Sequence, residues 1–187
     1  MIPQIVSLEE FIEDFGVQDF NNLAAVFSCP KDIELEAFLK DKAIINNSLS
    51  MSRTYLVVGK DETNNVPIIM AYFALALKSI DINAGISKTQ RQKFTGTRNN
   101  NMKHIPVYLI GQFAKNFAIP ENDRITGNDL MTLTKATINN AHKRVGGRIV
   151  LVECSDVPQL HTFYNTHGFA FYDIDSEDRL HRFVMKL

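Results

Sequence analysis

A strand–loop–helix unit between Ile105 and Arg144 carries the residue types of an anion-binding site. The apolar run from Ile105 predicts a buried strand, and a polar loop leads from it to Gly127, where a helix is predicted to begin. The first amides of a helix lack internal partners and carry the positive end of its dipole, so they bind phosphate where a glycine lets the ligand approach. Gly127 therefore indicates a phosphate site. The alternative is a plain loop whose helix is capped by Asn128 or Asp129.

A second candidate is the tyrosine in the run Phe-Tyr-Asn-Thr-His-Gly-Phe at residues 163–169. Tyr164 comes near the end of a short predicted helix, just before Gly168 and a strand. A phenol at this place can face a cleft and donate a proton to a reacting group. The alternative, which the sequence leaves open, is an aromatic core residue at a helix–strand corner.

Hydrophobic periodicity predicts the elements that must position these residues. Ser7 and Glu10 form a predicted capping box for a first helix, which Gly16 ends. Residues 78–103 contain few large apolar side chains and are predicted to be the least regular part of the chain. The other predicted elements are a helix at about 32–45, a hairpin of 54–59 and 66–77 with a polar turn at 61–65, a strand at 105–113, a helix at about 127–144 ended by Gly146 and Gly147, a strand at 148–154, a short helix capped by Asp156, and strands at 169–174 and 180–186.

Composition is typical of one globular domain, because 187 residues exceed a prior of ~150 per domain only slightly. The longest apolar run, residues 68–77, is far shorter than the ~20 residues that span a bilayer, and the start of the chain lacks the pattern of a secretory signal. We therefore expect a soluble, cytoplasmic protein without a membrane partner. Cys29 and Cys154 are 125 positions apart and no Cys/His cluster has zinc spacing, so we expect no metal site.

Several segments, in this order and at these distances, resemble the GCN5-related N-acetyltransferase (GNAT) superfamily. Upstream segments resemble the branch that contains toxin-type, tRNA-directed acetyltransferases. The segments of the first kind are 105–115, 124–127, 148–153 and 163–169, and those of the second kind are 27–32, 38–43 and 54–58. The resemblance implies an α/β (α+β) fold, with a twisted mixed sheet of six or seven strands flanked by helices. It also implies a V-shaped splay between the parallel strands 105–114 and 148–154, where acetyl-CoA lies.

The resemblance also assigns residues to acetyl-CoA. The backbone of residues 113–115 would pair with the pantetheine arm, and the amide of Phe113 or Ala114 would stabilise the oxyanion. Arg124 and Gly127 match the first and fourth positions of the family's pyrophosphate loop, Gln/Arg-x-x-Gly-x-Gly/Ala. The expected cofactor-binding residues are Phe113, Ala114, Lys115, Arg124, Ile125, Thr126, Gly127, Asn128, Asp129 and Leu130.

Two features depart from the family pattern. Asp129 occupies the sixth loop position, where Gly or Ala is usual, and residues 116–123 lengthen the loop. A carboxylate beside a pyrophosphate is unfavourable, although an acid in the first turn of a helix is favourable and can point outward. These departures leave open a second hypothesis, a non-catalytic GNAT-fold binding module whose CoA loop is degenerate.

The expected catalytic residue is Tyr164, which matches the family's general acid and would protonate the departing CoA thiolate. No general base is evident. Glu153, late in a strand, is one option, against the alternatives of an acid turned to solvent and of an ordered water acting as base. His104 and His161 are expected to be surface residues, and Cys154 a buried, inert thiol.

Charge is unevenly distributed behind a net charge of −1. Residues 1–47 carry 3 basic and 9 acidic side chains, whereas residues 82–120 carry 6 basic side chains and no acid. We therefore expect one domain, 1–187, with an acidic helical part (1–47) and a basic irregular insert (about 82–104). The insert from Lys88 to Lys103 is a candidate site for tRNA or for the 3′-phosphate of CoA, against the alternative of a merely solvated segment.

The predicted function is acetyl-CoA-dependent N-acetyl transfer to an amine. The acceptor stays open among an aminoacyl-tRNA, a small amine and a protein amine, and the chain is expected to be a monomer or a homodimer. A third hypothesis is a nucleic-acid-binding protein that uses residues 88–103.

Overall fold

The computed structural model describes residues 3–60, 66–82, 87–96 and 102–187. The chain falls into two compact units. The first consists of Met1–Leu75 with Gln112–Thr134, and the second of Ala76–Gly111 with Lys135–Leu187. None of the helices in the described part of the chain combines the length and hydrophobicity that a membrane span requires.

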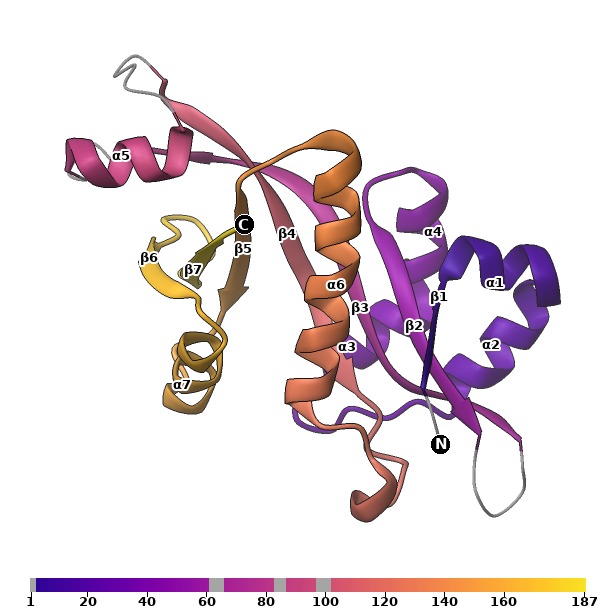
Figure 1. Cartoon of the computed structure of the whole chain (residues 1–187). Helices are drawn as coiled ribbons and strands as arrows, with labels where there is room; N and C mark the ends of the chain where they lie inside the picture. The colour runs from indigo at the N-terminus through magenta and orange to yellow at the C-terminus, as the bar shows by residue number, and fades with distance from the viewer. Residues whose placement is uncertain (1–2, 61–65, 83–86, 97–101) are drawn as a thin grey trace. The chain divides into compact units, whose positions relative to one another are not determined.

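Figure 1 labels the elements along the chain. In chain order they are β1 (Gln4–Ser7), α1 (Leu8–Phe15), α2 (Val17–Ala25), α3 (Ile33–Ala37), the π-helical turn η1 (Phe38–Lys42), α4 (Ala43–Ser48), β2 (Arg53–Lys60), β3 (Pro67–Asp81), α5 (Lys88–Thr95), β4 (His104–Lys115), the 3₁₀ turn η2 (Glu121–Asp123), α6 (Gly127–Val145), β5 (Ile149–Cys154), α7 (Pro158–Thr166), β6 (Ala170–Ile174) and β7 (His181–Lys186).

Within the described residues, seven strands form one sheet in the order β1-β2-β3-β4-β5-β7-β6. The pairs β1·β2, β2·β3, β5·β7 and β6·β7 are antiparallel. β4 and β5 are parallel, with Tyr108–Ile110 opposite Val150–Val152. The predicted mixed α/β sheet, the hairpin and the parallel pair are therefore confirmed, while the V-shaped splay stays a prediction.

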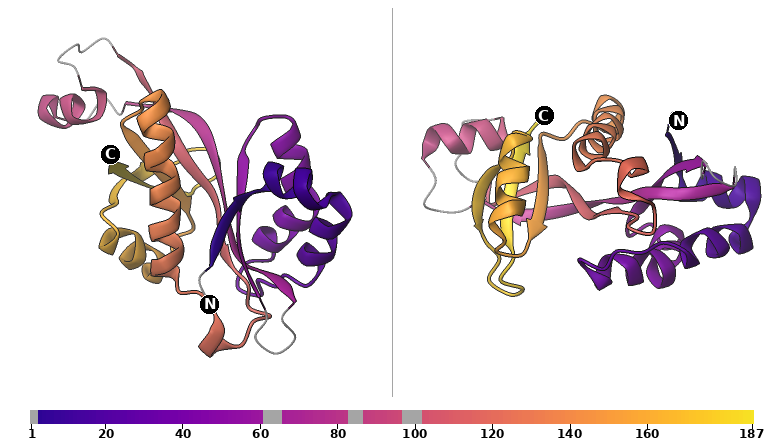
Figure 2. Two further views of the ribbon diagram at one scale, coloured as in Figure 1. Left: turned by 45° about the vertical axis from the view of Figure 1, so that its right-hand side comes forward. Right: turned by 90° about the horizontal axis from the view of Figure 1, so that it is seen from below.

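In the first unit, the N-terminal helices pack their apolar sides against the strands. The predicted capping box of α1 is present, since Ser7 Oγ accepts from the Glu10 amide and Glu10 Oε2 accepts from the Ser7 amide, each at 3.1 Å. Phe11, Phe20 and Leu39 are buried in one cluster with side chains of β2 and β3. Figure 2 shows these helices gathered on one face of the strands of this unit. The spacing of apolar positions therefore gives α1 and α2 one buried face each.

In the second unit, the predicted Gly146–Gly147 stop ends α6 with both glycines at positive φ. Tyr108 donates its hydroxyl proton to the Gly146 carbonyl. A Cβ on Gly147 would lie 2.5 Å from the ring of Tyr108, so glycine is required there by close approach as well as by its φ of +105°.

Two expectations about elements were wrong. Residues 78–103 are not uniformly irregular, because β3 continues to Asp81 and residues 88–95 form α5. α5 has no apolar stripe of its own and is instead anchored by Phe94, whose ring lies edge-on to Tyr172 at 5.6 Å. Asp156 does not cap α7, because the N-cap is Val157. The predicted turn at 61–65 and the basic residue Arg98 lie outside the described residues.

Asn116 is a fully buried polar residue at the end of β4. Its Nδ2 donates to the carbonyl of Ile69 (2.9 Å), and its backbone amide donates to that of Met70 (2.9 Å). Its Oδ1 accepts from the amides of Ser28 (3.1 Å) and Ala118 (2.9 Å). One neutral amide group thus joins β3, the segment after α2 and the segment after β4, and satisfies buried backbone groups of all three.

Replacing Asn116 by alanine should lower the free energy of unfolding by about 2–4 kcal/mol, because buried backbone groups lose their partners. Urea denaturation measures this loss. The matched control is Asn22→Ala at an exposed position of α2, where the Asn22 Oδ1 accepts from Gln18 Nε2 at 3.1 Å. This substitution should change the free energy of unfolding by no more than about 0.5 kcal/mol. Equal effects of the two substitutions would contradict the role of Asn116.

Candidate cofactor site and catalytic tyrosine

The ten expected cofactor residues all belong to the first unit, whereas Tyr164 belongs to the second. β4 runs to Lys115, with Ala114 buried and Phe113 and Lys115 half-buried. The chain then passes through Asn116 and η2 to the start of α6. The structure therefore confirms the strand–loop–helix order in which the expected cofactor residues lie, and their contacts with acetyl-CoA stay a prediction.

Arg124 braces the lengthened loop that precedes it. Its Nη2 donates to the carbonyls of Ile119 (2.7 Å) and Phe117 (3.3 Å), and its Nε donates to Ile119 (3.2 Å). Its guanidinium also lies 4.6 Å from the centroid of the Phe117 ring. The side chain thus holds residues 117–119 against the start of α6, which explains how an eight-residue insertion keeps a fixed path.

Three cations surround the ring of Phe117, and we call Lys31, Lys115 and Arg124 the cation cluster. The Nζ atoms of Lys31 and Lys115 lie 5.2 Å and 5.8 Å from the ring centroid. Burial, followed by the charges of Arg124 and Lys31, lowers the pKa of Lys115 from its ordinary value. Like charges held this close favour an anion as ligand, because the anion relieves their repulsion.

Two members of this group, Lys31 and Phe117, carry no local sequence signal of an anion site. Lys31 is distant in sequence from β4, and Phe117 lies in the segment that was interpreted only as an insertion. The amide of Phe117 donates to the carbonyl of Ser28 at 2.7 Å, which brings the two segments together. The only sequence signal for the cluster was the absence of acidic residues from 82 to 120.

The start of α6 is closed by a reciprocal pair of side chains. Thr126 Oγ1 accepts from the Asp129 amide (3.1 Å), and Asp129 Oδ2 accepts from the Thr126 hydroxyl (2.5 Å) and amide (3.3 Å). The Leu130 amide donates to the Thr126 carbonyl at 3.1 Å. The cap is therefore Thr126, rather than Asn128 or Asp129 alone. Asp129 folds back over the first turn and places a negative charge at the positive end of the helix dipole.

A cavity of about 410 Å³ lies beside this turn. Its lining includes the carboxylate residues Asp123 and Asp129 together with Arg124, and Met70 of β3. Two carboxylates oppose the entry of a polyphosphate. Anion binding in this unit is therefore favoured beside Lys31 and Lys115 of the cation cluster rather than in this cavity, which Arg124 also lines.

Tyr164 lies on α7 in the second unit, with a side chain that is 8% exposed. Its ring packs against Phe163, Phe169 and Phe183, with centroids at 5.4, 5.8 and 6.1 Å. Burial, with a smaller contribution from Cys154, raises the pKa of the phenol well above its ordinary value. The residue is thus an aromatic core residue whose hydroxyl stays protonated at neutral pH, as a general acid must before it acts.

Glu153 is not turned out to solvent, and this expectation was wrong. Its side chain is 13% exposed, and both carboxylate oxygens accept from Lys78 Nζ at 2.7 and 2.8 Å. The two residues meet because β3 and β5 belong to the same sheet. Both carboxylate oxygens are thus paired with Lys78, an arrangement that disfavours Glu153 as a general base.

Cys154 is buried, as predicted, and burial followed by the charge of Asp156 raises the pKa of its thiol to about 11. The thiol therefore stays protonated at neutral pH and is a poor nucleophile. His161, expected at the surface, is only 24% exposed through its side chain, whereas that of His104 is 62% exposed.

The basic insert presents some of its charges to solvent. Lys88 and Lys103 are exposed, while Arg91 Nη1 donates to the Met102 carbonyl at 3.0 Å and holds the end of the insert against α5. Figure 2 shows α5 beside the β6–β7 hairpin, where Phe94 meets Tyr172. Part of the insert is therefore an anchored helix that begins at the exposed Lys88, and the exposed Lys103 lies beyond this helix, just before β4.

Comparison with known proteins gives structural relatives only. No protein-family model matches the chain, and no curated protein is significantly similar to it in sequence. A variant of KacT, with a tyrosine replaced by phenylalanine, is similar at TM-score 0.70 and 20% identity over 97% of this chain and 94% of KacT. AtaT in complex with acetyl-methionyl-tRNAfMet is similar at TM-score 0.69 and 19% identity over 99% of this chain and 95% of AtaT.

A complex of AtaT and AtaR (AtaTR) with acetyl-CoA gives a third match, at TM-score 0.66 and 19% identity over 98% of this chain and 93% of that one. These similarities extend over nearly the whole length of both chains, so they concern the complete arrangement of helices and strands rather than one motif. The chain therefore has the GNAT-like fold found in KacT and the AtaT toxin.

Proposed function

We propose that this protein is an acetyl-CoA-dependent N-acetyltransferase that transfers the acetyl group directly to an amine, with Tyr164 as general acid. The observation that carries the proposal is the full-length fold similarity to AtaT, whose structures contain acetyl-CoA and an acetylated aminoacyl-tRNA. Acetyl-methionyl-tRNA is the product that acetyl transfer to the amine of methionyl-tRNA would give. An aminoacyl-tRNA is therefore the favoured acceptor, ahead of a small amine or a protein amine.

The cation cluster supports the cofactor half of the proposal. Lys31, Lys115 and Arg124 lie at the end of β4 and ahead of α6, the segment expected to hold the phosphates of CoA. CoA carries a pyrophosphate and a 3′-phosphate, so it supplies the anion that this cluster favours. The backbone of residues 113–115 and the loop amides from Ile125 to Leu130 would complete the binding.

Tyr164 has one role in the proposed reaction, which is to protonate the departing sulfur. The lone pair of the acceptor amine forms a C–N bond with the thioester carbon, and the C–S bond then breaks with its electron pair on sulfur. The Tyr164 hydroxyl gives its proton to that sulfur, and water takes the proton that the amine loses. The buried phenol, whose pKa lies above its ordinary value, is neutral at neutral pH and therefore carries the proton that this step transfers.

Tyr164→Phe should lower kcat by about 10²–10⁴-fold, the usual contribution of a general acid, with little change in the Kd for acetyl-CoA. Turnover is measured with methionyl-tRNA and with an amine panel, and binding is measured by calorimetry. The matched control is Tyr172→Phe, which removes a hydroxyl that donates to the Asp81 carbonyl at 2.8 Å. Unchanged turnover in Tyr164→Phe would remove this residue from the mechanism.

Lys31→Gln and Lys115→Gln should each weaken CoA binding by about 3–30-fold, because each removes a charge that contacts phosphate. Calorimetry at several salt concentrations should also show a shallower salt dependence in both variants. Lys40→Gln is the control, since Lys40 is a half-buried lysine of the same unit that pairs with Glu36 at 2.6 Å. Equal weakening by all three substitutions would contradict a specific phosphate site.

A second candidate function, a binding module with a degenerate CoA loop, is favoured by Asp129. Its carboxylate lies over the first turn of α6 and occupies the Thr126 amide. Asp129→Asn removes the charge and keeps an oxygen that can accept the capping bond. For an acetyltransferase we expect the parent to bind acetyl-CoA and this variant to bind it about 2–10-fold more tightly. Binding that only the variant shows would support the module instead.

A further inference from the structure

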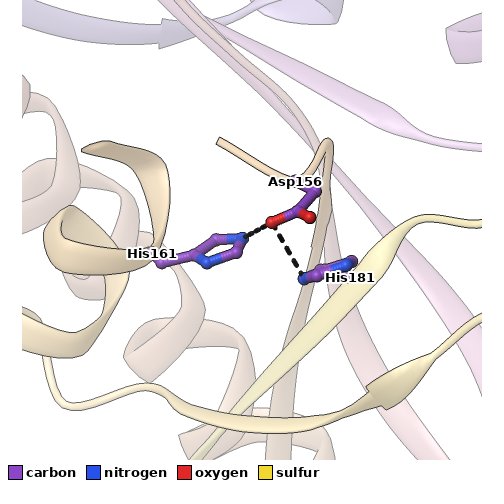
Figure 3. A group of neighbouring side chains, drawn as sticks. All are labelled: Asp156, His161 and His181. Atoms are coloured by element: carbon purple, nitrogen blue, oxygen red, sulfur yellow. Dashed lines mark ion pairs between the residues drawn. The ribbon is translucent and has the colours of Figure 1, made fainter. Parts of the chain in front are cut away.

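Asp156, His161 and His181 form a cluster in the second unit, drawn in Figure 3. Asp156 lies between β5 and α7, His161 lies on α7, and His181 is the first residue of β7. Three separate segments thus point one side chain each at a common space. The cluster takes no part in the proposed acetyl transfer.

The three facing atoms of the cluster lie slightly farther apart than atoms that bind one common ion. His161 Nε2 lies 3.7 Å from Asp156 Oδ1, and His181 Nδ1 lies 3.8 Å from the same oxygen. Both distances exceed a hydrogen bond. One ligand atom from each residue lies within 4.8 Å of the other two. A tetrahedral or trigonal ion with bonds of about 2.0–2.1 Å needs ligand separations of roughly 3.3–3.6 Å, so a small inward movement would close the site.

The two ring nitrogens that face Asp156 have no other partner. Within the described residues, His161 Nε2 and His181 Nδ1 are buried atoms without a hydrogen bond. Buried polar atoms are nearly always bonded, so two unbonded nitrogens that face the same carboxylate oxygen call for an explanation. A single cation at the centre would satisfy both nitrogens and the oxygen together.

Aromatic packing holds the rings in this arrangement. The imidazoles of His161 and His181 are stacked at 4.9 Å, His161 also packs on Phe183 at 5.0 Å, and Phe171 lies edge-on to His181 at 5.6 Å. The side chains of His161 and His181 are 24% and 16% exposed, whereas that of Asp156 is 72% exposed. The two rings therefore belong to a half-buried aromatic layer, and the carboxylate stands at the solvent side, so the inward movement would fall mainly to Asp156.

We propose that Asp156, His161 and His181 bind a divalent transition-metal ion, with Zn²⁺ as the best match. Two imidazole nitrogens and one carboxylate oxygen form a ligand set that zinc accepts in tetrahedral sites, while Mg²⁺ and Ca²⁺ prefer oxygen alone. The exposed side of Asp156 leaves the fourth position to water. The ion would join α7 to β7 and to the end of β5. His161 is three residues before Tyr164, so the ion would also fix the helix that carries the tyrosine.

The test uses the full-length protein after treatment with a chelator and dialysis. Calorimetric titration with ZnCl₂ should show one site per chain with a micromolar or lower Kd. Co²⁺ as a second probe should give the visible absorption of a tetrahedral nitrogen–oxygen site. Zinc should raise Tm, because it binds only the folded arrangement. These readouts do not depend on acetyl transfer. A negative result for zinc therefore leaves the proposed function untouched, and a failure of the proposed function leaves the zinc result untouched.

Variants decide whether the zinc is held by this cluster. Asp156→Asn, His161→Gln and His181→Gln should each weaken zinc binding at least 10-fold, and Asp156→His, which supplies another nitrogen ligand, should retain it. The matched control is His104→Gln, which removes an exposed histidine that lies 2.5 Å from Asp81, and it should bind as the parent does. Because Asp156 is exposed, its variants keep the test valid if a histidine variant does not fold. Absence of 1:1 binding in the parent, or equal binding by the parent and Asp156→Asn, would overturn the proposal.

Discussion

The buried amide of Asn116 is the interaction on which the proposed cofactor region depends. This side chain both accepts and donates hydrogen bonds and carries no charge. Only Asn and Gln combine these properties in one amide group. By bonding to Ile69, Ser28 and Ala118 it fixes the segment after α2 beside the end of β4. Lys31 and Phe117, which lie in the segments so joined, reach one another for this reason. The cation cluster is therefore a consequence of a neutral hydrogen-bonded contact rather than of attraction between charges.

Opposing charges meet at the beginning of α6. The cation cluster attracts anions to the end of β4, while Asp129 brings a carboxylate to the Thr126 amide, in the loop proposed to hold the phosphates of CoA. The same carboxylate stabilises the helix through its bond with Thr126. An acid in a first turn thus favours the fold and opposes the ligand. The balance between this attraction and this repulsion distinguishes the proposed acetyltransferase from the binding module. The balance is local, so the net charge of the whole chain does not predict it.

Local sequence signals predicted most elements and missed those without a signal of their own. The Ser7–Glu10 capping box and the Gly146–Gly147 stop act over a few residues, and both are present. α2 was missed because Gly16 ends α1 and is also the N-cap of the next helix. β1 has only four residues, which is too short for a periodic pattern. α5 is held through the contact of Phe94 with Tyr172 of β6, so it needs no apolar stripe and shows no helical periodicity.

The sequence by itself determined most of the strands and helices and their order, including the strand–helix–strand unit β4–α6–β5, and the position of Tyr164 on a short helix before a glycine. Only the tertiary structure decided which charged and polar side chains meet. It paired Glu153 with Lys78, gathered three cations around Phe117, and turned Asp156 from a predicted helix cap toward two histidines. The physical reason is range. Periodicity and capping depend on residues that are close in the sequence. These contacts instead join distant residues, which are brought together only by the register of the sheet and by buried hydrogen bonds between segments.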